Sequence, residues 1–170
     1  MEIDQRLDEA IAEKTADGRF QLAVTAGGAQ FLADEPLAAG GLGSGPSPYQ
    51  LLASALAACT TMTLLLYIER KGWDAKVRCT AVGHRRDEGC DPPDVFTRRI
   101  EFEGEVEPAQ RTRLLEIADR CPVHRTLTKG AWVLTTDADM PTAAPATQHM
   151  VDMEALIAVG RGSFDFTETA

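Results

Sequence analysis

The sequence has no tract in which lysine and arginine gather beside aromatic residues, and basic residues are outnumbered, 17 against 26 acidic ones. The formal net charge is −9 at pH 7. A surface of that sign repels phosphate backbones and anionic membrane surfaces. We therefore expect neither nucleic acid nor a membrane among the partners of this protein.

Charged residues are also missing from Pro36 to Ile68, a length that raises the question of a transmembrane helix. The first third of that stretch is rich in glycine and proline, and the remainder holds polar side chains such as Gln50 and Ser54 among many alanines. This composition favours a buried core helix over a membrane span. Residues 1–4, Met-Glu-Ile-Asp, do not resemble the basic start of a signal peptide, so we expect a cytoplasmic protein.

With 170 residues, of which 44% are hydrophobic and 25% charged, the chain suits one well-buried globular domain. We expect an N-terminal helical extension over residues 1–17, with a short charged helix over 4–14. The main domain should span residues 18–138. Residues 139–170 should form a proline- and alanine-rich linker and a C-terminal tail, which either straps a partner subunit or frays.

Alternating and helical patterns predict an α+β fold with antiparallel sheets and two core helices. Turn glycines, helix caps and prolines mark where each element begins and ends. The predicted elements are a strand over 19–25, a Gly27-Gly28 turn, a strand over 30–33, a helix from Pro48 to Lys71 capped by Ser47, strands over 76–82 and 96–106 joined by a polar loop, a helix from Pro108 to Cys121 ended by Pro122, and a strand over 131–136.

Two of the four cysteines end apolar helical stripes. The stripes are Leu52, Leu56, Cys59, Met62 and Leu66 on the first helix, and Leu114, Ile117, Ala118 and Cys121 on the second. Both thiols should therefore point inward, and the two sulfurs meet if the helices pack together. In a cytosolic core such a pair is typical of transient redox chemistry and not of a permanent disulfide.

The same segments resemble the OsmC/Ohr family, named for osmotically inducible protein C and organic hydroperoxide resistance protein. The resemblance covers roughly residues 18–138 and is carried by Asp34-Glu35-Pro36, Gly40-Gly41, Gly45-Pro-Ser-Pro48, Cys59 and Cys121-Pro-Val-His-Arg-Thr-Leu127. It implies an intertwined homodimer with its sites at the subunit interface. It also implies thiol-dependent reduction of hydroperoxides, in which Cys59 attacks the peroxide and Cys121 resolves the sulfenic acid. An external dithiol would restore the enzyme, without a bound cofactor or metal.

A reactive thiolate needs a nearby cation or a helix N-terminus, and Cys59 lies about three turns into its helix, beyond the reach of the terminal dipole. Arg19 corresponds best to the arginine that the family places beside its reactive cysteine. Arg98 is the second candidate, because it lies in phase with an apolar strand face; it could also be an edge residue that only covers the core.

One position departs from the hydroperoxide-resistance branch of the family. Where that branch has a glutamate that holds the catalytic arginine, this chain has Tyr49 followed by Gln50, as in the OsmC-like branch. Tyr49, Gln50 or another group would then hold the arginine. His124, three residues after Cys121, is placed to exchange a proton with the sulfur.

Two other classes of function remain open at this stage. In the first, the dimer binds an apolar ligand in the same cleft and the cysteines only line it. In the second, Cys121 and His124 bind a metal together with His84 and Cys90. Cys79 alternates with Val77 and Ala81 and is expected in the core, whereas Cys90 is expected in a polar loop.

Overall fold

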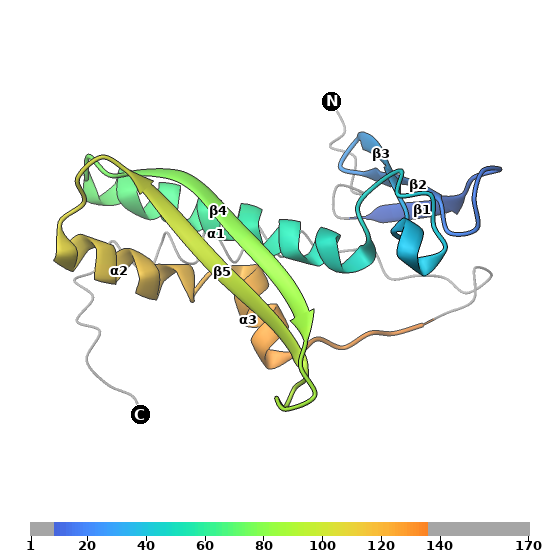
Figure 1. The fold of residues 1–170 in the computed structure, drawn as a ribbon. Coiled ribbons are helices and arrows are strands. Elements are labelled where there is room, and N and C mark those ends of the chain that lie inside the picture. Colours follow the sequence, from blue (N-terminus) through green and yellow to red (C-terminus); the bar gives the residue numbers. More distant parts are fainter. Residues whose placement is uncertain (1–8, 136–170) are drawn as a thin grey trace.

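The computed structural model describes residues 9–135 (Figure 1). These residues form a small N-terminal sheet, a long helix and a hairpin flanked by two further helices. The elements are β1 (Ala10–Lys14), β2 (Leu22–Ala26), β3 (Ala29–Ala33), a 3-10 turn (Leu37–Ala39), α1 (Pro48–Lys71), β4 (Lys76–Arg86), β5 (Asp94–Glu103), α2 (Pro108–Ala118) and α3 (Pro122–Lys129).

The N-terminal sheet has the order β1-β2-β3 and is antiparallel throughout. Gly27 and Gly28 form the predicted turn, and both have the positive φ angles, 55° and 79°, that this tight hairpin requires. The helix predicted over residues 4–14 is wrong for residues 10–14, which pair with 26–22 as a strand. Hydrogen bonding to β2 outweighs the weak local preference for helix, and residues 1–8 lie outside the described part.

The loop between β3 and α1 is organised around the carboxylate of Asp34, which is 3% exposed. Its Oδ2 accepts hydrogen bonds from the Leu42 and Ser44 N–H groups and from Ser44 Oγ, at 2.9, 3.2 and 2.9 Å. Burial alone would raise the pKa of Asp34, but these bonds and one from the Glu35 N–H hold it below its usual value. The loop therefore ties the N-terminal sheet to the start of α1.

Helix α1 begins and ends where the sequence predicts. Ser47 is its N-cap and Pro48 its first residue, the Ser47 N–H donates to Gln50 Oε1 at 2.8 Å, and Gly72 ends it with a φ of 62°. By length and composition α1 could cross a membrane. In the fold it packs against β4, α2 and α3, as a core helix does.

The inward face of α1 differs in part from the predicted stripe. Leu52 and Met62 are 43% and 53% exposed, whereas two threonines take inward positions. The buried residues of the helix are Ala53, Leu56, Cys59, Thr60, Thr63, Leu64 and Ile68. Because α1 is apolar on nearly every face, its hydrophobic pattern alone could not identify the side that packs within one subunit.

Strands β4 and β5 form an antiparallel hairpin that crosses α1 (Figure 1). It is longer at its tip than predicted, because residues 83–86 belong to β4 and residues 94–95 to β5, and the polar loop is confined to 87–93. The register shifts between Val77 and Cys79. This bulge inserts one extra residue and moves the inward positions to Thr80, Val82 and His84, so Cys79 is exposed and its predicted core position is wrong.

The core cluster at the α2 end of the molecule contains Leu64 and Ile68 of α1 and Leu114, Ile117 and Ala118 of α2, which confirms the second predicted stripe. Helix α2 ends at Ala118, three residues earlier than predicted. Residues 131–135 have no regular structure, so the predicted last strand is wrong there, and Trp132 is 96% exposed. A strand needs a hydrogen-bonding neighbour. Residue 136 and the predicted linker and tail lie outside the described residues.

Candidate functional site

Cys59 of α1 and Cys121 before α3 come together in the core, as their stripes predict. Their side chains are 3% and 0% exposed, both are thiols, and the two sulfur groups are in hydrogen-bonding contact. Leu56 completes the buried cluster, and apolar side chains from the hairpin and α3 pack against it: Val82, Phe96, Val123 and Leu127. Two thiols separated by 62 positions in the sequence thus lie together in one buried, largely apolar cluster.

Cys121 is the N-cap of α3. Its Sγ accepts the His124 N–H at 3.3 Å, because Pro122 at the first helical position sets the chain direction that leaves the first N–H groups pointing back toward the sulfur. Thr60 Oγ1 lies 3.6 Å from the same sulfur. Cys59 Sγ in turn accepts the Val123 N–H at 3.5 Å.

Arg98 of β5 also reaches this cluster. Its side chain is 13% exposed, and Nη1 donates to Thr60 Oγ1 at 3.0 Å and to the Ala118 carbonyl at 2.9 Å. Nη2 forms an ion pair with Asp119 Oδ1 at 2.5 Å. The inward phase predicted for Arg98 is confirmed, and the guanidinium is bound to protein groups and does not extend into water.

The two thiols have opposite electrostatic surroundings. The hydrogen bond with Cys121 and burial raise the pKa of Cys59. The hydrogen bond with Cys59 lowers the pKa of Cys121 against the effect of burial, and the His124 N–H, the Thr60 hydroxyl and the charge of Arg98 lower it further. In the reduced subunit the negative charge is therefore favoured on Cys121.

The other predicted site residues take different positions. Arg19 lies before β2 in the N-terminal region, with its guanidinium 4.9 Å from the centre of the Phe20 ring. Within the described residues the fold therefore brings Arg98, and not Arg19, to the cysteines. Gln50 caps α1 with its side chain. The contact of His124 with the sulfur is made by its backbone N–H.

Tyr49 stacks on His84 with ring centres 4.0 Å apart. His84 Nε2 lies 2.9 Å from Asp94 Oδ1, and its ring also contacts Phe96, which packs against the cysteine cluster. Sequence reasoning missed this aromatic stack and also missed Thr60 and Asp119. Only the adjacency of Thr60 to Cys59 could have drawn attention to that residue.

Within residues 9–135 no three histidine, cysteine, aspartate or glutamate side chains are close enough to hold a metal ion. Cys90 is exposed in the hairpin loop, where its N–H donates to the Asp87 carbonyl at 3.0 Å. The described residues thus do not assemble the zinc site considered from the sequence.

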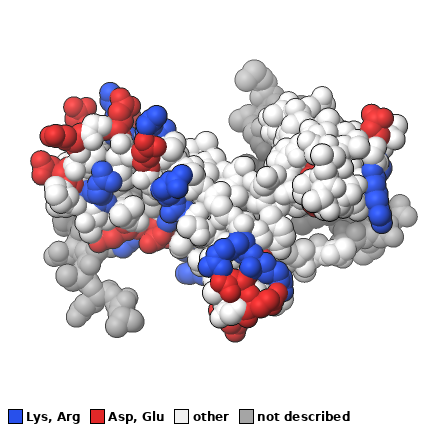
Figure 2. All heavy atoms as spheres, in the orientation of Figure 1, with Lys and Arg blue, Asp and Glu red and all other residues white. Residues whose placement is uncertain are grey.

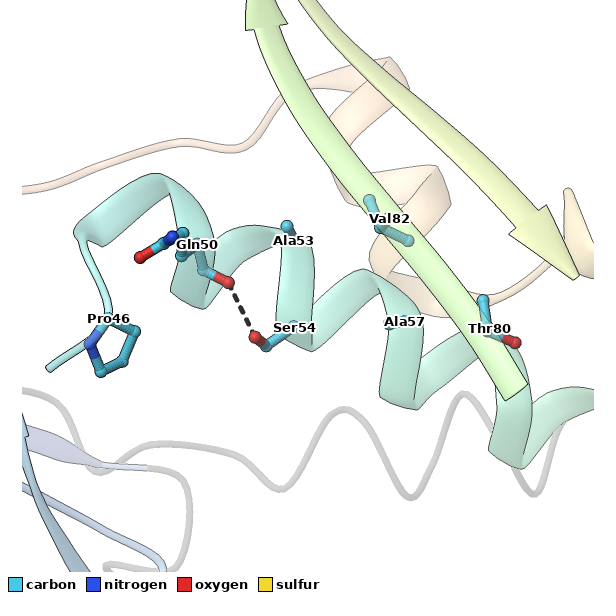
Figure 3. A pocket seen from close by; sticks show the side chains of 7 residues that line it. All are labelled: Pro46, Gln50, Ala53, Ser54, Ala57, Thr80 and Val82. Atoms are coloured by element: carbon cyan, nitrogen blue, oxygen red, sulfur yellow. Dashed lines mark hydrogen bonds between the residues drawn. The ribbon is translucent and has the colours of Figure 1, made fainter. Parts of the chain in front are cut away.

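An open cavity of about 470 Å³ lies between the first half of α1 and β4 (Figure 3). Ser54 Oγ donates to the Gln50 carbonyl at 2.7 Å along its wall. The lining residues are Pro46, Gln50, Ala53, Ser54, Ala57, Thr80 and Val82. Neither cysteine is among them, so this cavity is not the cysteine-lined cleft that an apolar-ligand binder would use.

Solved structures of similar fold come from several bacteria. A putative osmotic stress induced and detoxification response protein of Psychrobacter arcticus matches with a TM-score of 0.55 and 19% identity, covering 69% of this chain and 85% of that protein. An OsmC-like protein of Mycoplasma pneumoniae has a TM-score of 0.53 and 19% identity, with 71% and 86% covered. An organic hydroperoxide resistance protein OsmC of Legionella pneumophila has a TM-score of 0.50 and 18% identity, with 70% and 87% covered.

At such sequence identities, these likenesses show only that the fold is shared. A comparison with curated protein sequences finds no match. The sequence pattern of the OsmC-like proteins is stronger evidence for the family than these structural likenesses. It matches residues 41–136, from the loop before α1 to the segment after α3. That range contains both cysteines of the buried pair. The chain therefore belongs to the OsmC-like protein family.

Proposed function

We propose that this protein is a thiol-dependent peroxidase that reduces organic hydroperoxides through Cys59 and Cys121. The observation that carries the proposal is the contact of two buried thiols, one from α1 and one at the start of α3, in one largely apolar cluster. Membership of a family that includes organic hydroperoxide resistance proteins supports the substrate class. The apolar residues packed around the cysteines, among them Leu56, Phe96 and Val123, are compatible with the organic part of such a peroxide.

The proposed reaction has two steps within the protein. The Cys59 thiolate attacks the distal peroxide oxygen, the O–O bond breaks, and a Cys59 sulfenic acid and an alcohol form. Cys121 then attacks the sulfenic sulfur. A disulfide forms, and the hydroxyl group leaves as water with the thiol proton. A dithiol reductant restores the two thiols.

Cys59 must lose its proton before it attacks. Cys121 is in hydrogen-bonding contact with it and can accept that proton. We propose that Arg19 of a second copy then stabilises the Cys59 thiolate. Arg19 lies between β1 and β2, and the sheet of these strands lies beyond the first turn of α1, away from α3 (Figure 1), which leaves it placed to serve another subunit.

A homodimer is part of this proposal. Leu52, Met62 and Leu65 of α1 are each more than two-fifths exposed in a single subunit, and Trp132, Val133 and Leu134 are almost fully exposed. Charged side chains gather near α2 and at the tip of the hairpin, and the surface between there and the N-terminal sheet is largely uncharged (Figure 2). A second copy would cover these apolar residues. A cytoplasmic location, where dithiol reductants are available, fits the same scheme.

The decisive experiment treats reduced protein with one equivalent of cumene hydroperoxide, blocks remaining thiols and maps the peptides by mass spectrometry. We expect a rapid Cys59–Cys121 disulfide and loss of turnover in Cys59→Ser. Cys79→Ser, which changes an exposed thiol, should retain activity and serves as the control. If both cysteines remain blockable while the peroxide persists, the proposal fails, and an apolar-ligand-binding dimer becomes the better reading of the fold.

A further inference from the structure

We propose that Arg98 and Thr60 make Cys121 the leaving sulfur when the Cys59–Cys121 disulfide is reduced, so that the reductant attacks Cys59 Sγ. The inference rests on the proposed function and adds to it the direction of the regeneration step. It also assigns Arg98 a positioning role toward the Cys121 sulfur, which Arg98 exerts through Thr60.

Hydrogen bonds connect Arg98 to Cys121 through the hydroxyl of Thr60. Arg98 Nη1 donates to Thr60 Oγ1 at 3.0 Å, so this oxygen accepts from the guanidinium. A hydroxyl has a single hydrogen to donate, and Cys121 Sγ, 3.6 Å from the oxygen, is the partner in its direction. A cation at the start of such a chain polarises each following bond, which favours negative charge on the last atom.

The position of Arg98 is fixed from three sides. Besides Thr60, the guanidinium binds the Ala118 carbonyl at the C-terminus of α2, where a cation is favoured, and the Asp119 carboxylate. The Asp119 side chain is 64% exposed, so water screens much of its charge, whereas the arginine is nearly buried. The His124 N–H at 3.3 Å adds a second donor to Cys121 Sγ from the other side.

This arrangement determines how thiol–disulfide exchange proceeds. A thiolate of the reductant attacks one sulfur, the S–S bond breaks, and its electron pair goes to the other sulfur, which leaves faster when it is the weaker base. Cys121 Sγ meets that electron pair with the Thr60 hydroxyl and the His124 N–H already in place. Cys59 then carries the mixed disulfide, and the second thiol of a dithiol releases it as a thiol while the reductant becomes its own disulfide.

The test uses glutathione, a monothiol that cannot complete the second step. The protein disulfide is prepared with cumene hydroperoxide and, separately, with diamide, then mixed with glutathione and quenched in acid. The released thiol is alkylated and the peptides are mapped. We expect glutathione on Cys59 and the alkyl group on Cys121. Glutathione on Cys121, or equal amounts on the two cysteines, would overturn the inference.

Substitutions at Thr60 and Arg98 test whether these residues act on the Cys121 sulfur or only maintain the fold. Thr60→Val keeps the shape and removes the hydroxyl, and should lower the ratio of Cys59 to Cys121 adducts by about tenfold, the effect of losing one hydrogen bond to a charged group. Thr60→Ser should restore the ratio. Thr61→Val is the matched control, since its hydroxyl binds Ala57 and Thr80. Arg98→Lys offers a second variant if Thr60→Val does not fold, and it should also lower the ratio.

The two oxidants distinguish this inference from the proposed function. If diamide forms the disulfide and cumene hydroperoxide does not, the peroxidase proposal fails. The position of the glutathione adduct then still decides whether Cys121 is the leaving sulfur. If neither oxidant joins Cys59 to Cys121, both are overturned.

Discussion

Cys59 and Cys121 have identical side chains, and their surroundings alone distinguish them. The donors that can stabilise an anion, from Arg98 through Thr60 and from the His124 N–H, gather at Cys121. The Cys59 thiol donates to that anion and is made harder to ionise by doing so. One proton is therefore shared unequally by the pair in the reduced state.

This inequality predicts the ultraviolet titration of the reduced protein, in a Cys79→Ser/Cys90→Ser background that removes the two exposed thiols. We expect about one thiolate per subunit at neutral pH, lost as the pH falls through about 6, because the pKa of Cys121 is lowered to about that value. Cys59→Ala removes the hydrogen bond that lowers the pKa of Cys121 most, and it should therefore shift the midpoint of the titration upward. A midpoint near 8.5, the value of an ordinary thiol, would contradict the prediction.

The same lowered pKa affects folding stability. A native thiol with a lowered pKa binds fewer protons than the unfolded thiol between about pH 6 and about pH 8.5. The contribution of Cys121 to stability is thus fully present above that window and is lost as the pH falls through it. Cys121→Ser should flatten the pH dependence of the urea midpoint in this range, and an unchanged profile would contradict the linkage.

At the scale of the elements, the loop between β3 and α1 depends on close backbone packing at Gly45. A Cβ atom there would lie 1.9 Å from the Leu32 carbonyl oxygen. Gly45→Ala should therefore destabilise the protein by about 2 kcal/mol or more, as overpacking against backbone does, measured by urea denaturation. Gly83→Ala in β4 is the control, because a Cβ there meets nothing within 4 Å. Equal midpoints for the two variants would show that the loop relaxes freely.

The elements also show which features a sequence can predict. The limits of α1 follow from Ser47, Pro48 and Gly72, which act on their own neighbours, and these limits were predicted correctly. The contact of the two cysteines could be predicted because each cysteine lies on an apolar helical stripe, and both cysteines face the core. Cys79 was misplaced because a bulge changes the parity of β4, and a bulge depends on the partner strand.

The candidate site was only partly predictable for a similar reason. The two cysteines and the inward phase of Arg98 are visible in local patterns. The path from Arg98 through Thr60 to Cys121 joins β5, α1 and the start of α3, and no spacing in the sequence relates these three positions. The exposed segment 131–135 was predicted as a strand from its composition, yet a strand forms only against a neighbour.

At the scale of the whole molecule, one subunit leaves apolar surface on α1 uncovered. Met62 and Leu65 are 53% and 48% exposed on a helix whose opposite face is already packed against β4, α2 and α3. Exposed apolar residues gathered on one element mark an interaction surface. We therefore expect this face of α1 to lie in the homodimer interface.

Met62→Glu should convert the dimer to monomer in sedimentation equilibrium, because a carboxylate buried against a second apolar helix is left without a partner. Leu115→Glu makes the same kind of change at a 47% exposed apolar residue of α2, away from this face of α1, and should stay dimeric. Peroxidase turnover should fall with dimer content if Arg19 of a second copy serves Cys59. If the Met62→Glu protein is monomeric and fully active, each subunit carries a complete site. Of the two candidate arginines, only Arg98 would then contribute to that site.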